Sequence, residues 1–287
     1  MAAVSAERLE AHVRMLAETL APRSVAHRAN LDAAASYVAV EMAAGGAEVS
    51  KQVYAAAGAE YRNVIGRLGP DTKERVVVGA HYDAAGPFPG ADDNASGVAG
   101  IIELVRVLAG TPLGVGVELV AYPCEEPPFF RTPYMGSMVH ANSLRAEGAR
   151  VRGMIALEMI GYFNDEPGSQ HFPTPLLKPF YPSRGNFITV VGKLGQGPLI
   201  RRVRRAMRRG SPLPVRTIQA PRAVPGVDFS DHASYWAAGF DAVMVTDTAF
   251  YRNPHYHTAH DTADTLDYAR MAMVVEGVRE AVVALAT

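Results

Sequence analysis

Residues 76–100 read VVVGAHYDAAGPFPGADDNASGVAG, and this stretch decides the fold. An apolar, strand-like run ends near residue 80, a loop rich in Gly and Pro follows, and a helical pattern begins near residue 95. A strand that passes through a loop into a helix is the repeating unit of parallel, helix-covered sheets. The stretch therefore predicts an α/β fold whose polar loop residues lie at the carboxyl end of a strand.

The same alternation continues on both sides of this stretch. Apolar runs predict strands at 61–68, 75–80, 115–122, 151–157, 186–192 and 242–246. Helical patterns cover 7–20, 31–45 and 268–285, and others lie near 95–109, 136–147, 196–209 and 231–238. Without an internal repeat or a Ser/Gly-rich linker, we expect one domain over 1–287, with N-terminal helices in 1–50 packed on the sheet. The Pro-rich segments 123–135, 163–185 and 211–229 predict long irregular loops that shape a pocket.

Composition excludes several classes of protein. The chain has 287 residues, 48% of them hydrophobic, and a net charge of -1, so nothing in its charge favours nucleic acid or a membrane surface. The single cysteine excludes an internal disulfide. Charged residues interrupt the first twenty positions, which therefore lack the apolar core of a signal peptide, and no apolar run of about 18 residues predicts a membrane span. We expect a cytoplasmic protein.

Acidic and histidine residues follow successive strand-like runs. They are His81 and Asp83, Asp92 and Asp93, Glu125 and Glu126, Glu158, and His257. Because the crevice of an open α/β sheet lies outside the carboxyl ends of its strands, these side chains can converge there although they are far apart in the sequence. Carboxylate and imidazole ligands that converge in this way predict a metal site, with two metals as the leading hypothesis.

Each group also has an alternative interpretation. Asp92 and Asp93 stand before a helical pattern, where such residues are ordinary N-caps. Glu158 lies within an apolar run, and a charge there must bind a metal or form a buried salt bridge. The histidines of the last group are His255, His257 and His260, and spacing alone does not choose among them. We interpret Cys124 as a packed residue rather than a nucleophile, because no paired base is evident.

Between residues 60 and 265 the chain resembles the zinc aminopeptidase and glutamate carboxypeptidase family of dinuclear metallopeptidases, which also includes the glutaminyl cyclases. The motifs that carry the resemblance are GAHYD, GADDNASG, CEE, LEMIGY, FSDHASYW and NPHYHTAHDT, in that order. Six motifs in sequence are far more specific than any one of them. The resemblance implies a three-layer α/β/α sandwich around a mixed, mostly parallel sheet of eight strands, with Ser230 as an N-cap in the FSDHASYW motif.

The resemblance also implies roles for individual residues. His81 and Glu158 would bind one zinc ion, Glu126 and His257 the other, and Asp93 would bridge the two; other divalent metals stay open. Glu125 would be the general base that deprotonates the bridging water and then protonates the leaving amine. Asp83 would support His81. Tyr256 would stabilise the oxyanion or, alternatively, is a packed loop aromatic.

The implied function is a metal-dependent exopeptidase, with release of an N-terminal residue from a peptide or dipeptide as the leading hypothesis. One departure weakens the aminopeptidase form, since aminopeptidases of the family usually have Asp where this chain has Glu158. A carboxypeptidase or small-molecule amidohydrolase is the alternative, and Arg131 or Arg252 could pair with its substrate carboxylate. A glutaminyl cyclase and an inactive binding homologue are further alternatives. The partner is a peptide or amino-acid amide, and a homo-oligomer stays open.

Overall fold

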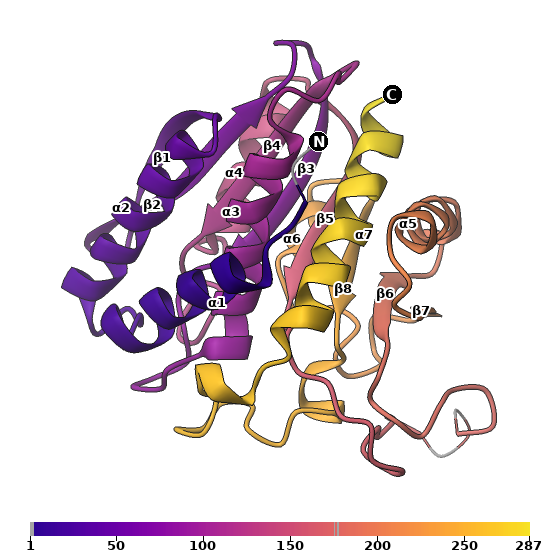
Figure 1. Ribbon diagram of the computed structural model, residues 1–287. Coiled ribbons are helices and arrows are strands. Elements are labelled where there is room, and N and C mark those ends of the chain that lie inside the picture. Colours follow the sequence, from indigo (N-terminus) through magenta and orange to yellow (C-terminus); the bar gives the residue numbers. More distant parts are fainter. Residues whose placement is uncertain (1–2, 175, 177) are drawn as a thin grey trace.

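A mixed sheet of eight strands runs through the middle of the molecule, in the order β1-β2-β4-β3-β5-β8-β6-β7 (Figure 1). The computed structural model describes residues 3–174, 176 and 178–287. The strands are β1 Glu48–Ala56, β2 Ala59–Leu68, β3 Glu74–His81, β4 Gly116–Tyr122, β5 Arg150–Glu158, β6 Ile188–Lys193, β7 Val215–Ala220 and β8 Ala242–Thr246. The central strands β4, β3, β5 and β8 are parallel to one another, so their carboxyl ends meet at one edge. Antiparallel pairs join β1 to β2, β2 to β4, and β6 to β8.

Helices cover both faces of the sheet. They are α1 Ala6–Arg14, which continues as a π-helical segment Met15–Thr19, α2 Arg28–Ala44, α3 Gly97–Leu108, α4 Gly136–Ala146, α5 Gly197–Gly210, α6 His232–Ala237 and α7 Tyr268–Ala286. Side chains of α1, α2, α3, α5 and α7 share one apolar cluster, whereas α4 and α6 contribute to a second cluster on the other face. This arrangement confirms the predicted three-layer α/β/α sandwich.

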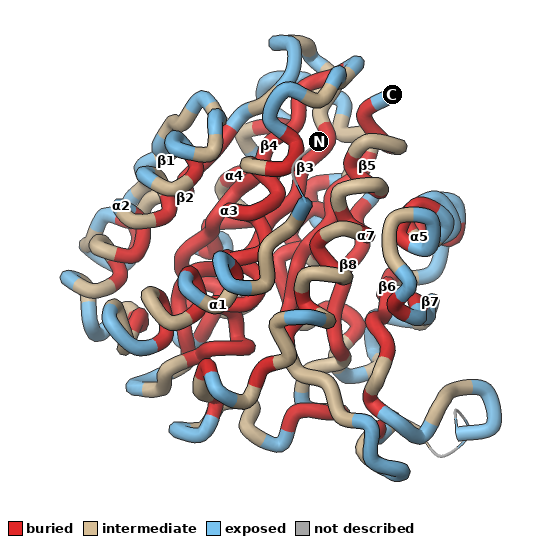
Figure 2. Tube along the Cα trace, viewed as in Figure 1, coloured by how far each residue is buried: buried red, intermediate tan, exposed pale blue. Residues whose placement is uncertain are grey.

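The central strands are buried on both sides, as Figure 2 shows in red. In β3, Val76 and Val78 belong to the first apolar cluster and Val77 to the second. Alternate residues of a strand point to opposite faces, so a strand with helices on both sides needs apolar residues at every position. The unbroken run VVV is therefore the sequence pattern of a central parallel strand.

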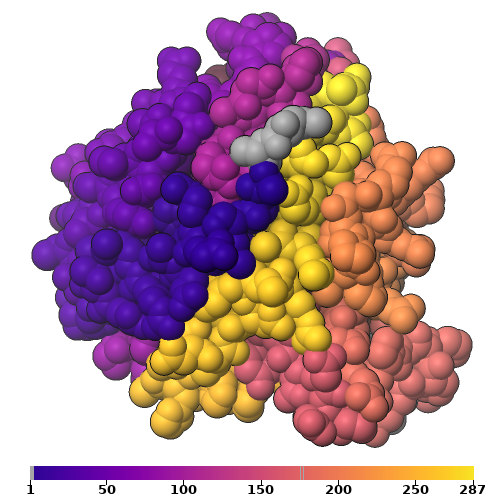
Figure 3. Space-filling model, viewed as in Figure 1, coloured from indigo at the N-terminus to yellow at the C-terminus, as the bar shows by residue number. Residues whose placement is uncertain are grey.

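The N-terminal residues lie against the C-terminal helix (Figure 3). The backbone N–H of Val4 donates to Oε1 of Glu276 in α7 at 2.9 Å, and Leu9, Val13 and Leu16 are fully buried. Apolar residues of α1 and α2 share the apolar cluster that also contains residues of the sheet. None of the helices in the described part of the chain is both long and apolar enough to cross a membrane.

Two strands were absent from the sequence prediction, and both lie at the edges of the sheet. No strand was predicted at β1, and β7 falls inside residues 211–229, which were wrongly predicted to be a continuous loop. The exposed and half-buried residues of these strands include polar side chains such as Lys51 and Arg216. An edge strand packs against few neighbours, so it lacks the apolar run that identifies a central strand.

Candidate metal centre

The carboxyl edge of the central strands brings together five predicted ligand residues. His81 is the last residue of β3, Glu158 is the last residue of β5, and Glu126 lies four residues beyond the end of β4. Asp93 comes from the loop after β3, and His257 from the loop after β8. All except His257 are buried, with 1% to 6% of their surface exposed.

The distances divide these residues into two groups that share Asp93. Oδ1 of Asp93 lies 3.3 Å from Nε2 of His81, and its Oδ2 lies 3.0 Å from Nε2 of His257. Nε2 of His81 is also 3.3 Å from Oε2 of Glu158, while Nε2 of His257 is 3.3 Å from Oε1 of Glu126. One carboxylate thus faces two separate sets of a histidine and a glutamate.

Four buried carboxylates of this centre receive no backbone hydrogen bond from the described residues. We call Asp93, Glu125, Glu126 and Glu158 the inner carboxylates. Oε2 of Glu158 accepts a hydrogen bond from the hydroxyl of Ser230 at 2.7 Å, whereas the buried Oε1 of Glu126 has no hydrogen-bond partner in the described part of the chain. Oε2 of Glu125 is 4.0 Å from Nε2 of His81.

Four other buried aspartates surround them, and we call these the outer carboxylates. Both oxygens of each accept an N–H at 2.8 to 3.2 Å. Asp83 accepts from the amides of Glu125 and Glu126, Asp92 from the amide of Gly161 and the side chain of Asn253, Asp247 from the amides of Tyr162 and Ala249, and Asp261 from the amides of Asp92 and Asp93. The outer carboxylates therefore fix the backbone that carries the inner ones.

Burial and charge together shift the pKa values of the inner groups. Burial raises the pKa of Glu125 well above its ordinary value, and it raises the pKa of Glu126 to about 7, assisted by the charge of Asp93. Burial opposes protonation of His81, but Glu158 and Glu125 outweigh it and hold the pKa of His81 well above its ordinary value. Because these carboxylates crowd together out of water, the site favours bound positive charge.

The donor set fits a metal ion. Oxygen or nitrogen atoms of His81, Asp93 and Glu126 all lie within 4.8 Å of one another. Imidazole nitrogen and carboxylate oxygen are the ligands that zinc takes at catalytic sites. A cation would also satisfy Oε1 of Glu126, which is buried without a hydrogen bond from the described residues.

Strained backbone holds several of these side chains. Cys124, Met159 and His257 have left-handed φ values of 65°, 50° and 54° although none is glycine. Cys124 precedes Glu125, and Met159 follows Glu158. The amide of Met159 donates to Oδ1 of Asn94 at 3.1 Å, which further fixes the position of Glu158. Such conformations persist only where the surroundings impose them, and they concentrate at functional sites.

Two predicted roles differ from the observed contacts. Asp83 was expected to support His81 through its carboxylate, but Nδ1 of His81 is closer to the backbone oxygen of Asp83, at 3.1 Å, than to Oδ1, at 3.5 Å. The Asp83 carboxylate accepts hydrogen bonds from the CEE backbone instead. Ser230 was wrongly predicted to cap a helix: α6 begins at His232 with Asp231 before it, and the Ser230 hydroxyl donates to Glu158.

The two arginines considered for a substrate carboxylate are already paired. Arg252 is buried, and its Nε donates to Oε1 of Gln170 at 3.0 Å. Nη2 of Arg131 lies 2.5 Å from Oδ1 of Asp228. Cys124 is fully buried, as its interpretation as a packed residue requires.

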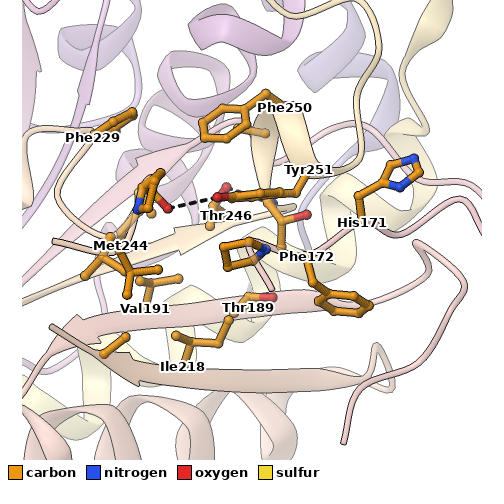
Figure 4. A pocket seen from close by; sticks show the side chains of 18 of the residues that line it. His171, Phe172, Thr189, Val191, Ile218, Phe229, Met244, Thr246, Phe250 and Tyr251 are labelled. Carbon is orange, nitrogen blue, oxygen red and sulfur yellow. Dashed lines mark hydrogen bonds between the residues drawn. The ribbon is translucent and has the colours of Figure 1, made fainter. Parts of the chain in front are cut away.

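A cavity of about 260 Å³ opens beside the centre (Figure 4). Glu158 of the metal centre and Tyr256, next to His257 in the sequence, line it, and the rest of its wall comes from β6, β7, β8 and the loops around them. The ring of Tyr256 stacks on that of His257, with 3.8 Å between centroids. Most of the wall is apolar or aromatic, which is typical of a ligand-binding pocket.

Comparison with known families identifies this constellation. The model of "Peptidase family M28" matches residues 63–282, a span that contains every inner and outer carboxylate. The chain belongs to peptidase family M28. Membership supports a metal-dependent peptidase and confirms the resemblance inferred from the six motifs.

Individual M28-like proteins extend the comparison. "Uncharacterized protein YfbL" of Escherichia coli K12 is 46% identical, with 96% of this chain and 86% of that protein aligned. A "Probable leucine aminopeptidase" of Trichophyton verrucosum is 26% identical over 73% of this chain, which spans only 53% of the fungal protein. The crystal structure of "a Zn-dependent exopeptidase from Parabacteroides distasonis" shares the fold, with a TM-score of 0.70, 21% identity, and 98% and 99% of the two chains covered.

The M28 site also uses residues that sequence reasoning missed. Asp261 received no predicted role, yet its carboxylate accepts hydrogen bonds from the amides of Asp92 and Asp93. Arg23 is fully buried and donates to the backbone oxygens of Tyr82, Leu16, Pro89 and Gly90 at 2.5 to 3.0 Å. The position of Asp261 in the NPHYHTAHDT motif gave a weak signal for its role. Nothing in the local sequence around Arg23 indicated its contacts.

Proposed function

We propose that this M28 chain is an aminopeptidase that releases the N-terminal residue of a peptide or dipeptide with the help of divalent metal ions. The observation that carries the proposal is the pair of histidine and glutamate sets joined by Asp93, beside a carboxylate, Glu125, that belongs to neither set. Metal-assisted amide hydrolysis needs both parts, one to bind the metal and one to carry a proton.

We propose two metal ions, with zinc as the simplest choice. His81 and Glu158 would hold one and Glu126 and His257 the other, with Asp93 shared. When bound, the ions supply a Lewis acid for the scissile carbonyl and make the attacking water more acidic. The Zn-dependent exopeptidase of similar fold supports this choice of metal.

Glu125 would move the proton. Its carboxylate is buried, receives no hydrogen bond from the described residues, and lies 4.0 Å from the nearest nitrogen of His81. It is therefore free to accept a proton from the attacking water and to donate it to the leaving amine. Asp83 orients Glu125 by accepting a hydrogen bond from its amide at 3.2 Å. Tyr256 lines the cavity, and its hydroxyl would donate to the carbonyl oxygen as its charge develops.

The charges around the cavity favour the amino end of a substrate. Glu158 lines the cavity, and no Lys or Arg among the described residues does so. An α-ammonium group is thus attracted, whereas neither arginine considered for a free carboxylate is available, because Arg131 is paired with Asp228 and Arg252 is buried. The fungal relative named as a probable leucine aminopeptidase supports the same direction.

Hydrolysis of matched amides tests the proposal. Zinc-loaded protein should cleave aminoacyl anilides with a free amine and leave their N-acetylated forms intact. The opposite preference would establish the carboxypeptidase or amidohydrolase alternative, and cyclisation of N-terminal glutamine without hydrolysis would establish the cyclase. If fully metallated wild type turns over none of these substrates, the chain is an inactive binding homologue. If wild type and Glu125→Ala are equally active, Glu125 is not the general base.

A further inference from the structure

The side chain of Arg23 is fully buried beside the metal centre and binds only backbone oxygens of the described residues. Its Nε donates to the oxygen of Tyr82 at 3.0 Å, and its Nη2 to that of Gly90 at 2.9 Å. Its Nη1 donates to the oxygens of Leu16 and Pro89 at 2.5 and 2.8 Å. One planar group thus joins an N-terminal helical segment to two points of the chain that follows β3.

The two points lie at opposite ends of one loop, and each end is next to a predicted metal ligand. Tyr82 directly follows His81, and Gly90 stands three residues before Asp93. Nε2 of His81 and Oδ1 of Asp93 face each other at 3.3 Å. The guanidinium group of Arg23 therefore holds the loop closed between two residues whose side chains must meet.

Gly90 transmits this constraint to Asp93. Its backbone is left-handed, with φ of 60°, and a Cβ at this position would collide with the backbone oxygen of Asp93. The Gly90 oxygen that Arg23 binds also accepts a hydrogen bond from the amide of Ala95 at 3.1 Å. Because the chain folds back on itself so tightly here, a displacement of Gly90 displaces Asp93 as well.

Opposite charges hold the two kinds of backbone group in this region. Arg23 binds carbonyl oxygens before Asp93, whereas Asp261 binds the amides of Asp92 and Asp93. Burial lowers the pKa of Arg23 to about 10, although the charges of Asp261, Asp83 and Asp93 oppose the shift, so the group is charged at neutral pH. Burying a guanidinium group is unfavourable, and an apolar side chain would fill the same space without that cost.

The shape of the arginine side chain suits this task. Three nitrogen atoms in one rigid plane reach separate carbonyl oxygens, whereas lysine would offer the same charge on a single nitrogen. On the basis of the proposed metal centre, we propose that Arg23 is a positioning residue that fixes Asp93 opposite His81 before metal binds. The affinity of the centre for metal then depends on the guanidinium group.

The zinc affinity of Arg23→Lys tests the inference. The variant keeps the charge but cannot bind both ends of the loop at once, so its zinc dissociation constant should rise by about 10- to 100-fold, as when a residue that orients ligands is lost. Competition with a chromophoric chelator measures this constant without any substrate. Equal dissociation constants in wild type and Arg23→Lys would overturn the inference.

A destabilised variant far from the loop is the matched control. Met42 is fully buried near the C-terminal end of α2, beside Gly66 of β2. Met42→Ala should lower the unfolding temperature, because it leaves a cavity, and should keep the zinc affinity of wild type. If Met42→Ala weakens zinc binding as much as Arg23→Lys does, Arg23 acts only through general stability and the inference fails.

Amide hydrogen exchange of metal-free wild type tests the same inference without a variant. The informative amides are those of Ala84, Asp93 and Ala95, which donate to the backbone oxygen of Arg23, to Oδ2 of Asp261 and to the backbone oxygen of Gly90. A loop fixed in advance should protect them before zinc is added. Rapid exchange that slows only with zinc would show that the metal orders the loop, and Arg23 would then not position Asp93.

These measurements are separate from the proposed function because neither needs amide hydrolysis. Weaker zinc binding by Arg23→Lys, in a protein whose wild type cleaves no amide, would refute the aminopeptidase and support the role of Arg23. Cleavage by wild type, together with unchanged zinc affinity in Arg23→Lys, would do the reverse.

Discussion

The inner and outer carboxylates are all buried and lie at the same edge of the sheet, yet their hydrogen-bond partners differ. Every oxygen of the outer set, Asp83, Asp92, Asp247 and Asp261, accepts an N–H. Among the described residues, the inner set, Asp93, Glu125, Glu126 and Glu158, receives the hydroxyl of Ser230 and contacts from two histidines, but no backbone amide.

The difference shows how buried carboxylates acquire different tasks. A buried carboxylate needs donors or a cation, since leaving it alone is unfavourable. Amides satisfy the outer set, which then holds loops in position. The inner set is available to bind a metal and to carry a proton. The outer set orients the inner set, because Asp83 accepts hydrogen bonds from the amides of Glu125 and Glu126, and Asp261 accepts one from the amide of Asp93.

Removal of metal should have the largest effect on the protein, and it should act through the inner set. Chelation should reduce peptidase activity to background and lower the unfolding temperature, because the inner carboxylates then repel one another without a cation. Added zinc should restore both. If the inner set were structural like the outer set, a chelator would change neither the rate nor the thermal unfolding curve.

Glu125→Gln should separate proton transfer from metal binding within the inner set. Loss of a general base lowers kcat by about 10²- to 10⁴-fold, while metal content measured by atomic absorption should stay at the wild-type level. Glu126→Gln is the matched control, since it should lose bound metal as well as activity. Loss of metal in Glu125→Gln would show that this residue is a ligand.

Asp261→Asn tests whether the outer set acts through the inner one. The amide of asparagine offers one acceptor where two N–H groups need one each, so Asp93 should be less well held. Metal affinity should fall by about 10- to 100-fold, the usual effect of losing a residue that orients ligands. Asp264→Asn changes an exposed aspartate nearby, whose side chain is 79% exposed, and should leave affinity unchanged.

Local sequence patterns predicted the parts of the fold that are most buried. The central strands, such as β3 with its Val76–Val78 run, pack on both faces and therefore have apolar residues throughout. The edge strands β1 and β7 pack on fewer neighbours, and their mixed composition resembles that of loops. Whether such a segment pairs depends on the strand beside it, which no local pattern records.

The candidate site divides in the same way. The five predicted ligand residues follow strands or stand in motif loops, so strand order alone brings them together. Asp261 and Ser230 act on backbone or side chains that are 72 to 169 residues away in the chain. These long-range hydrogen bonds, like those of Arg23, come from the packing of distant segments. The residue types alone did not predict which groups would pair.

Two buried histidines extend the comparison to pH. His81 lies among inner carboxylates, whereas His12 in α1 is 4% exposed and has its Nδ1 2.6 Å from the hydroxyl of Tyr37. Burial lowers the pKa of His12 from 6.5 to about 4. Between these pH values, His12 is protonated in the unfolded chain but not in the folded chain. The contribution of His12 to stability is therefore complete above pH 6.5 and declines as the pH falls.

The smallest expected effect is the part of this pH dependence that belongs to His12. Between pH 7 and 5.5 its contribution should fall by about 1 kcal/mol. Urea unfolding of wild type and His12→Gln at both pH values isolates it, because every other titrating group is common to the two proteins. An equal loss of stability in both would mean that His12 takes up its proton in the folded state. Burial, with the charges of Arg8 and Arg106 opposing that of Glu103, would then be insufficient to exclude a proton from His12, and the opposite pKa shifts of His12 and His81 could not be attributed to the inner set.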